Sequence, residues 1–323
     1  MTDLFCDLVL EGGGVKGIGL VGAVETLHKA QYNFQRIAGT SAGAIVGSLL
    51  ASGISVERLV ELMQSLDYTK FQDESGILDH LGLAGKTASL IFQKGIYQGI
   101  YLHNWLRDQL AELGVQTFAD LKLTEPWAQK LPPEQRYKLV VITSDVTQGR
   151  LVRLPWDYKE LYGLDPDSQS VADAVRASMS IPFFYKPYKL QRRLLVDGGM
   201  LSNFPIDLFD TTNQWPTFGL KLSSRSDALM HSNPTSNSFE FATAILDTLT
   251  NAHDRMHIDN PATQKRTIFI DTSDIKATDF SITPAQQHTL YQSGKTEAAD
   301  FLKTWNYDSW KKFAAATKRV GKD

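Results

Sequence analysis

The sequence predicts an α/β fold, namely a three-layer α/β/α sandwich with a mostly parallel central sheet and a helical insertion. Strand and helix signals alternate at the start of the chain, which is the order of a parallel sheet covered by helices. Strand signals then vanish between residues 55 and 123, and this gap predicts the helical insertion. The strands that return later are too few for a second core, so we expect one sheet built from both ends of the chain.

The chain opens with two strand–helix pairs. An apolar strand at residues 5–10 precedes a glycine cluster and a helical pattern at 18–30, and a second strand at 36–40 precedes a helix at 42–51. Residues 37–56 carry no charge and are long enough to cross a bilayer. However, nine of these 20 residues are Gly, Ser or Thr. A buried strand, a tight turn and a buried helix explain the small residues better than a membrane span does.

The remaining elements follow from local signals. Ser170 and Asp173 suit a capping box at the start of a short helix, which Pro182 prevents from continuing. Thr283 and Pro284 form an N-cap and first-turn pair for a long final helix. The other predicted elements are strands at 137–143, 150–154, 193–196, 217–222 and 266–270, and helices at 171–179 and 239–256.

The composition argues against some classes of function. The chain has 33 basic and 36 acidic side chains and no long basic run, so nucleic acid is not expected as a partner. Its single cysteine, Cys6, cannot form an internal disulfide. The first residues lack the basic region of a secretory signal. We therefore expect a cytoplasmic protein, with peripheral membrane contact as one option.

The first motif is the glycine cluster at 12–17, GGGVKG, which satisfies GxGxxG between a strand and a helix. In a dinucleotide-binding turn an acidic ribose ligand follows about 20 residues later. That acid is missing here, so only an NADP-binding variant using Arg36 would fit. Consecutive glycines before a helix can also offer backbone N–H groups to an anion, including a transient oxyanion. A tight turn without any ligand is the third reading.

The second motif is GTSAG at 39–43, which fits GxSxG. A sharp strand-to-helix turn of this kind presents a serine hydroxyl at a helix N-terminus, where developing negative charge is favoured. A nucleophile and a simple packing turn of small residues both remain open for this motif. An α/β-hydrolase does not fit, because in that fold several strands precede the nucleophile.

The third motif is VDGG at 196–199, an acid at the end of an apolar strand followed by two glycines. Taken alone, Asp197 could simply cap a turn. In a parallel sheet, however, all three motifs would lie at the carboxyl ends of strands, where α/β sites are found. No histidine completes a serine triad, and we interpret His253 and His257 as surface or packing residues, so no metal site is expected.

Together these motifs resemble the patatin-like phospholipase family. The matching residues are EGGGVKG at 11–17, GTSAG at 39–43, ASMSIP at 177–182 and VDGG at 196–199, in the order of the family. Glu11 departs from the family pattern, which usually has Asp there. The resemblance covers about residues 6–210 and is only general beyond them.

The resemblance implies a Ser-Asp dyad without histidine, in which Ser41 is the nucleophile and Asp197 the base. Backbone N–H groups of the glycine loop would form the oxyanion hole, from the residues Gly12, Gly13, Gly14 and Val15. Other residues are expected to shape the pocket or meet a headgroup, namely Lys16, Ala42, Ser178, Pro182, Gly198 and Gly199. For Lys16, a solvated or structural role is an equal alternative.

The resemblance further implies a serine lipid acyl hydrolase of the phospholipase A, lysophospholipase or esterase type, which needs no metal and no cofactor. Its expected partner is a lipid or ester substrate. Two alternatives are an NADP-binding oxidoreductase, which would use the glycine loop and Arg36, and a catalytically silent binding protein with a hydrolase fold. The intact Ser41 and Asp197 argue against the silent protein.

The resemblance also implies one patatin-like domain over residues 1–323. Its core would span about 6–210, a helical cap or insertion about 56–130, and the strand and helices at 211–323 would complete the fold. Aromatic residues of the insertion either cover an acyl chain or pack in an ordinary core, and these are Phe92, Tyr97, Tyr101 and Trp105. The basic segment at 309–323 is expected to be a frayed tail, with contact to an anionic membrane as the alternative.

Overall fold

The computed structural model describes residues 4–73, 95–210, 214–222, 260–272 and 275–320, together with four positions in the region between 223 and 259. These four positions, Phe241, Ala244, Ile245 and Thr248, are helical, and the rest of the helix predicted at 239–256 lies outside the described residues. Other predictions also fall outside them, on Phe92, His253 and His257.

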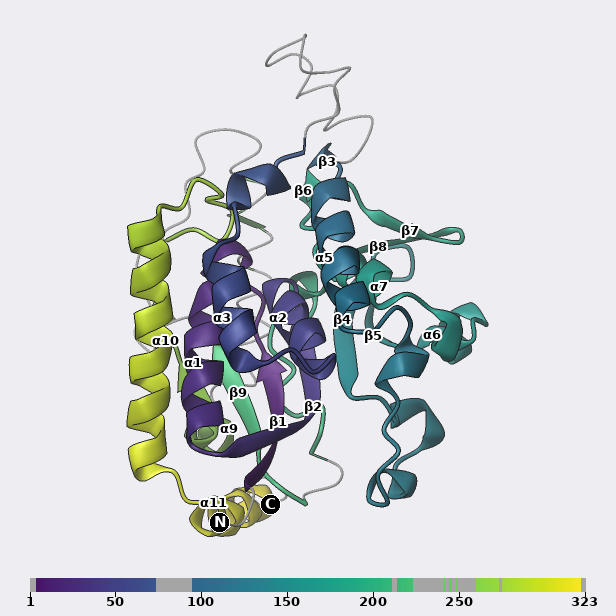
Figure 1. The fold of residues 1–323 in the computed structure, drawn as a ribbon. Helices are drawn as coiled ribbons and strands as arrows, with labels where there is room; N and C mark the ends of the chain where they lie inside the picture. The colour runs from purple at the N-terminus through teal and green to yellow at the C-terminus, as the bar shows by residue number, and fades with distance from the viewer. Residues whose placement is uncertain are drawn as a thin grey trace.

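The core of the molecule is an eight-stranded mixed sheet in the order β10-β9-β1-β2-β4-β8-β7, with β5 also paired to β4. Neighbouring strands from β10 to β4 run parallel, whereas β5, β7 and β8 pair antiparallel. The strands are β1 Leu4–Leu10, β2 Tyr32–Thr40, β4 Leu139–Asp145, β5 Arg150–Leu154, β7 Tyr188–Leu190, β8 Arg193–Asp197, β9 Thr217–Lys221 and β10 Thr267–Phe269. As expected, strands from both ends of the chain share one sheet (Figure 1).

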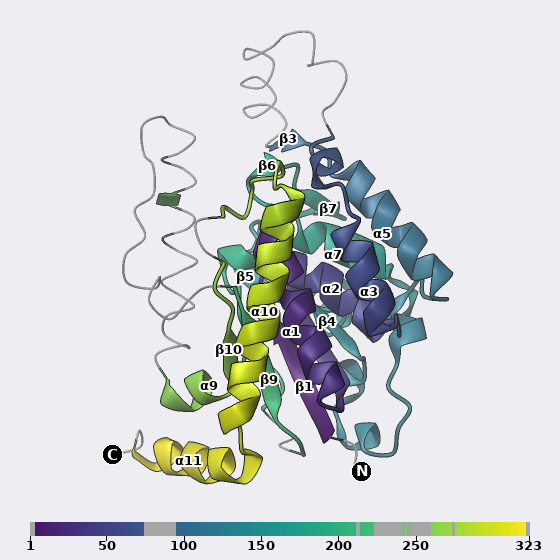
Figure 2. The ribbon, with the colours of Figure 1, turned by 60° about the vertical axis from the view of Figure 1, so that its left-hand side comes forward.

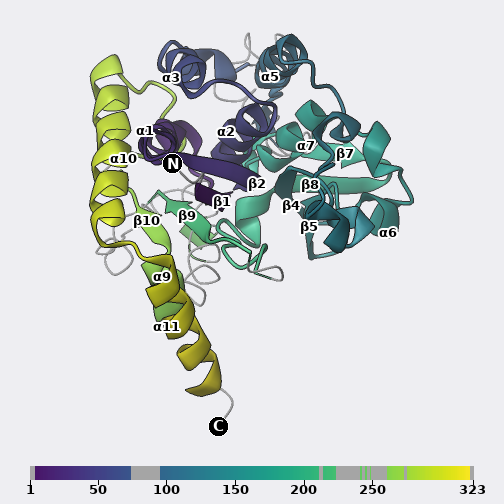
Figure 3. The ribbon, with the colours of Figure 1, turned by 60° about the horizontal axis from the view of Figure 1, so that its bottom comes forward.

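Helices flank this sheet, which confirms the predicted α/β class. Helices α1, α2, α3, α5 and α7 lie on one side of the strands (Figure 3). Helix α10 runs alongside α1 (Figure 2), and the two backbones approach closely where Gly22 and Gly294 lack side chains. The helices are α1 Ile18–Lys29, α2 Ala42–Ala51, α3 Val56–Gln64, α5 Ile100–Glu112, α6 Tyr158–Tyr162, α7 Val171–Ser178, α9 Pro261–Lys265, α10 Pro284–Thr304 and α11 Tyr307–Val320.

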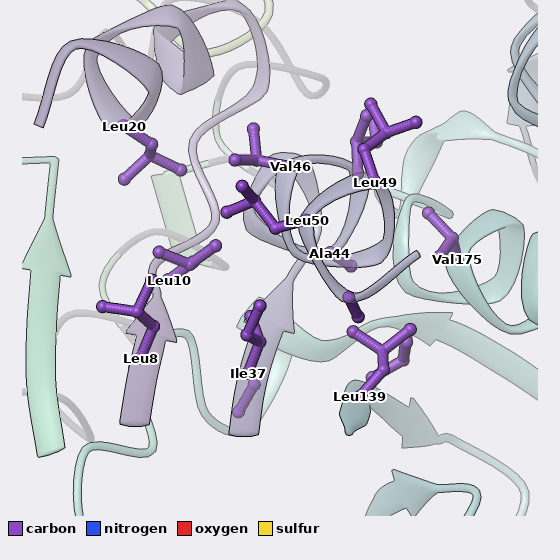
Figure 4. Close-up of a cluster of buried hydrophobic side chains, with 14 of the residues drawn as sticks. Leu8, Leu10, Leu20, Ile37, Ala44, Val46, Leu49, Leu50, Leu139 and Val175 are labelled. Carbon is purple, nitrogen blue, oxygen red and sulfur yellow. The ribbon is translucent and has the colours of Figure 1, made fainter. Parts of the chain in front are cut away.

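Helix α2 is the most deeply buried helix described, because all ten of its residues are buried. It packs on the strands β1, β2 and β4 and on α7 (Figure 4). The side chains that meet there include Leu10, Ile37, Leu49, Leu139 and Val175. The uncharged stretch at 37–56 is therefore the end of β2, the turn at Ser41, helix α2, a second turn and the first residue of α3. Among the described residues, no helix is both long and apolar enough to span a membrane.

The secondary-structure elements described in the insertion are all helices except for one strand that we did not predict. Strand β3, Gly95–Tyr97, pairs in parallel with β6, Phe183–Tyr185, in a separate two-stranded sheet. Each strand has only three residues, so neither carries a periodicity that could be recognised. The pairing joins segments far apart in sequence, and only the tertiary fold brings them together.

The predicted frayed tail is also wrong over its first part, because residues 307–320 form the helix α11. The indole of Trp310 donates a hydrogen bond to the carbonyl of Ala262 at 2.9 Å. The Lys265 ammonium lies 3.7 Å from the centre of the Phe313 ring, a cation–π contact. These contacts dock α11 on α9. The sequence does not reveal them, because its basic residues are equally typical of a solvated tail.

Candidate active site

The glycine loop and the GxSxG turn meet at one edge of the sheet because β1 and β2 are parallel neighbours. Leu10 and Gly39 are paired in register, so the residues that follow them leave the sheet side by side. A Cβ atom placed on Gly12 would lie 2.9 Å from the Cβ of Ser41. The two loops are therefore in direct contact, as the sequence predicts.

Ser41 lies in a sharp turn between β2 and α2. Its φ is +51° and its ψ is −123°, a conformation that non-glycine residues rarely adopt and that costs about 1–3 kcal/mol. The flanking glycines make this turn sterically allowed. A Cβ on Gly39 would lie 2.3 Å from the carbonyl oxygen of Gly43, and a Cβ on Gly43 would lie 2.3 Å from that of Leu10. The turn places the hydroxyl at the N-terminus of the buried helix α2, where negative charge is favoured.

Asp197 lies near Ser41 because of the register in which β8 pairs with β4, and not because of the direction of β8. We expected a parallel strand to carry it, but β8 is antiparallel to β4. In β4, Ile142 pairs with Thr40 of β2, and the next residue, Thr143, pairs with Asp197. Asp197 is therefore level with Ser41 across the intervening strand β4. The expected proximity is present, although its assumed cause was wrong.

The carboxyl group of Asp197 is buried, and burial is the largest influence on its pKa, which is raised from 3.8 to about 6. The nearby Ser41 hydroxyl and a hydrogen bond from the Gly199 N–H, at 2.8 Å, oppose this rise. The Ser41 hydroxyl also lies 3.4 Å from the sulfur of Met179. Because a carboxylate is a much stronger acceptor than a thioether, we assign the hydroxyl proton to Asp197.

The two glycines after Asp197 let the chain turn close to β4. A Cβ on Gly198 would lie 2.4 Å from the carbonyl oxygen of Ile142, and a Cβ on Gly199 would lie 3.0 Å from the side-chain oxygen of Asn203. Gly198 and Gly199 therefore position the carboxyl group by permitting close approach of the backbone.

Ser178 holds the backbone of the turn. Its hydroxyl accepts the N–H of Ser41 at 2.8 Å and donates to the carbonyl of Ile142 at 2.6 Å. Its side chain is fully buried and does not line the pocket that the structure shows. Ser178 was expected in a pocket wall, but the structure instead places it behind the turn, where it ties α7 and β4 to the candidate nucleophile.

We expect Ser178→Ala to lower the free energy of unfolding by about 1–3 kcal/mol, because it leaves the N–H of Ser41 and the carbonyl of Ile142 unpaired in the interior. Urea denaturation measures this loss. Ser65→Ala is the matched control, since the exposed Ser65 hydroxyl bonds only the Leu62 carbonyl of its own helix. Equal stability of the two variants would show that Ser178 does not hold the turn.

Of the four backbone N–H groups predicted to hold the oxyanion, two already donate to carbonyl groups of the protein. The N–H of Gly12 donates to the carbonyl of Asn203 at 3.4 Å, and the N–H of Val15 donates to that of Ala277 at 3.0 Å. Within the described part of the chain, the N–H groups of Gly13 and Gly14 make no hydrogen bond. Gly14 also has a φ of +55°, which favours glycine. Gly13 and Gly14 are thus the two members of the predicted set that remain available.

Two residues that support the glycine loop were not identified as such from the sequence. Asn203 donates its side-chain N–H to the carbonyl of Gly12 at 3.0 Å. The carboxylate of Glu11 forms a buried ion pair with Lys221 and accepts the N–H of Leu222, at the end of β9. Glu11 was noticed only as a departure from the family pattern, and its partner lies about 200 residues away, so no local signal connects them.

A small, partly open apolar pocket with a volume of about 10 Å³ lies beside Ser41. Its lining begins next to the candidate nucleophile and continues along α3 and the short helix Tyr68–Phe71. The lining residues are Gly14, Ala42, Ile45, Met63, Leu66, Tyr68, Phe71, Met179 and Phe280. Of the residues predicted to shape a pocket or meet a headgroup, Ala42 is the one in this lining, whereas Lys16 and Pro182 lie elsewhere, half-buried.

Arg36 does not fit the NADP alternative. Its side chain is 1% exposed and lies within β2. It pairs with Asp7, whose carboxylate also accepts the backbone N–H of Arg36 at 3.0 Å, and it stacks 4.5 Å from the centre of the Phe209 ring. A guanidinium buried in this way cannot reach a ribose phosphate at the edge of the sheet. Arg36 therefore cannot serve as the phosphate ligand that an NADP-binding glycine loop would need.

The described histidines do not contact the pair. His28, His103 and His288 lie on α1, α5 and α10, and none of them is a partner of Ser41 or Asp197. His103 instead contacts Asp173 at 2.7 Å. In the parts of the chain that are described, no cluster of His, Cys, Asp or Glu could hold a metal ion.

Comparisons with known proteins agree with the fold and with the motifs. A family model for patatin-like phospholipases matches residues 8–210. An uncharacterized Bacillus subtilis protein, YqhO, is 37% identical over 308 residues, covering 94% of this chain and 100% of that protein. Lysophospholipase nte1 of Aspergillus niger is 25% identical over 202 residues, covering 62% of this chain and 11% of that protein.

Among solved structures, VipD from Legionella pneumophila matches with a TM-score of 0.53 at 18% sequence identity, covering 93% of this chain and 67% of that chain. At this identity the match shows a shared fold. The family model covers more than half of this chain and includes the glycine loop, the GxSxG turn and the Asp-Gly-Gly segment. The chain belongs to the patatin-like phospholipase family.

Proposed function

We propose that the protein is a serine lipid acyl hydrolase, with Ser41 as nucleophile and Asp197 as base. The observation that carries this proposal is the proximity of the Ser41 hydroxyl to a buried Asp197 whose pKa it influences, beside an apolar pocket. A carboxylate with an ordinary pKa near 3.9 is a weak base for a serine hydroxyl. The raised pKa of Asp197 makes its carboxylate a better base near neutral pH.

The reaction proceeds in two acyl transfers. The Ser41 oxygen attacks the ester carbonyl carbon while its proton passes to Asp197, and a tetrahedral oxyanion forms. This intermediate collapses by breaking the bond to the alcohol, which leaves with the proton from Asp197. Water then attacks the acyl-enzyme and gives a proton to Asp197. Collapse of the second intermediate releases the free acid and returns the proton to Ser41.

The oxyanion would be held by the N–H groups of Gly13 and Gly14, which remain available within the glycine loop. The N-terminus of α2 adds a favourable field at Ser41. Removal of one donor from an oxyanion hole typically costs about 100- to 1,000-fold in rate. The loop therefore has to be held rigidly, and its bonds to Asn203 and Ala277 serve this purpose.

The apolar lining favours a substrate with a hydrocarbon acyl chain. A phospholipid, a lysophospholipid or a simpler carboxylic ester would fit this description, and the name lysophospholipase given to nte1 agrees with it. The acyl chain would enter between α3 and Phe280, while the alcohol part would stay outside the pocket.

Labelling with a fluorophosphonate tests this proposal directly. We expect covalent labelling of Ser41 with a stoichiometry of about one, and free fatty acid among the products from mixed lipids. The rate of labelling should rise with pH through about 6 and then level off, because Asp197 must be ionised to accept the proton. A rate that is flat over this range would contradict the role of Asp197, and labelling at a serine other than Ser41 would contradict the site.

A further inference from the structure

The hydroxyl of Tyr68 is a buried polar group that the proposed reaction does not use. Tyr68 is 5% exposed, lines the apolar pocket and packs its ring edge-to-face on Phe71. Its hydroxyl oxygen is buried and has no hydrogen-bond partner in the described part of the chain. Burial raises the pKa of this phenol, so the group stays protonated and can donate a hydrogen bond.

An unpaired hydroxyl of this kind is costly and rare. Leaving a buried donor without a partner costs about 1–3 kcal/mol, and most buried side-chain polar atoms do have a partner. Phenylalanine would fill nearly the same space without this cost. Tyr185 shows the usual arrangement in the same region, since its buried hydroxyl donates to the carbonyl of Phe71 at 3.0 Å.

A trapped water does not account for the Tyr68 hydroxyl. Buried waters typically make about three hydrogen bonds. Among the side chains that line this pocket, the phenol is the only one with an oxygen or nitrogen, because the others are aliphatic, aromatic or thioether groups. Besides the phenol, the lining offers such a water the backbone N–H of Gly14, and these two partners are fewer than the usual three. The natural partner of the hydroxyl is therefore an acceptor carried into the pocket by the ligand.

We propose that Tyr68 selects substrates whose acyl chain carries an oxygen along its length, such as a hydroxyl, keto, epoxide or ether group. The ester carbonyl itself cannot satisfy Tyr68, because it must lie at Ser41 and the glycine loop. A plain hydrocarbon chain would bury the hydroxyl without a partner, whereas an oxygenated chain would accept its hydrogen bond. This inference rests on the proposed acyl hydrolase function and names the substrate class of the same site.

The test compares 4-nitrophenyl octanoate with analogues in which one methylene, at successive positions along the chain, is replaced by an ether oxygen. For each ester, kcat/KM is measured with the wild type and with Tyr68→Phe. For each enzyme, the preference is the ratio of kcat/KM for the ether analogue to kcat/KM for the octanoate. The ratio of the two enzymes' preferences is independent of the intrinsic reactivity of the esters. We expect the wild type to favour the oxygenated chain at one or two positions, and Tyr68→Phe to lose about tenfold of that preference.

Thermal unfolding provides the matched structural control. Tyr185→Phe removes a satisfied hydrogen bond and should lower Tm by a few degrees, whereas Tyr68→Phe should leave Tm unchanged or raise it. A loss of Tm in Tyr68→Phe equal to that in Tyr185→Phe would show a structural partner and overturn the inference. An unchanged preference at every position of the oxygen would also overturn it. If no ester is hydrolysed and Ser41 is not labelled, the proposed function itself fails.

Discussion

Ser41→Ala is expected to reduce kcat/KM for a medium-chain ester by about 10⁴-fold or more. The variant keeps the pocket and the glycine loop but has no oxygen that can form the acyl-enzyme. In serine hydrolases, loss of the nucleophile typically removes most of the catalysis and leaves only what binding and the oxyanion hole supply. Steady-state hydrolysis and fluorophosphonate labelling measure the effect.

The fold of this variant should remain intact, because the Ser41 hydroxyl is a partner of Asp197 and Met179 and of no backbone group in the described structure. Circular dichroism checks this expectation. Ser52→Ala is the control for a hydroxyl at the other end of α2, where Ser52 donates to the carbonyl of Ser48 at 2.7 Å. Substantial turnover by Ser41→Ala, with Ser52→Ala as active as the wild type, would rule out Ser41 as nucleophile.

Asp197→Asn is expected to abolish hydrolysis and to make the protein more stable at pH 7. Asparagine cannot accept the proton of Ser41, so the activity is lost. The rise in the pKa of Asp197 from 3.8 to about 6 means that the folded state penalises the ionised carboxylate, by roughly 3 kcal/mol at pH 7. The neutral amide avoids this penalty, and so the free energy of unfolding should rise by up to that amount.

The sign of this effect depends on pH. As the pH rises from about 4 through about 6, the unfolded chain loses the proton of Asp197 before the folded chain does, so the wild type loses stability over this interval. Below it both states are protonated, and the advantage of Asp197→Asn should vanish. Urea denaturation at pH 4 and pH 7 measures this, with Asp300→Asn as a surface control because Asp300 is exposed and pairs only with Lys303. A variant less stable than wild type at pH 7 would contradict the buried, penalised carboxylate.

The sequence was sufficient to predict an α/β sheet with flanking helices, and the family resemblance implied that Ser41 meets Asp197. This succeeded because the first two strands carry clear local signals, and because glycines mark the places where backbones must approach closely. The direction of β8 was predicted wrongly. An apolar strand looks the same whether its neighbour runs parallel or antiparallel, so register alone decided where Asp197 would lie.

Other features depend on contacts that the sequence does not show. The pair of Glu11 and Lys221 joins residues about 200 positions apart, and the short strands β3 and β6 become recognisable only when they pair. The partnerless hydroxyl of Tyr68 is likewise invisible in the sequence, because a tyrosine among apolar residues looks like any core aromatic. Whether residues 1–323 form a single domain stays a prediction.

The place of β9 beside β1 has a consequence for how the protein is made. Strand β1 leaves the ribosome about 200 residues before its partner β9, which begins only at Thr217. Until then one side of β1 is an open edge, which is a template for aggregation. Ala277, which binds the glycine loop, emerges later still. The nascent chain therefore carries Ser41 long before its surroundings are complete, and we expect a functional site to assemble only after Ala277 has been made.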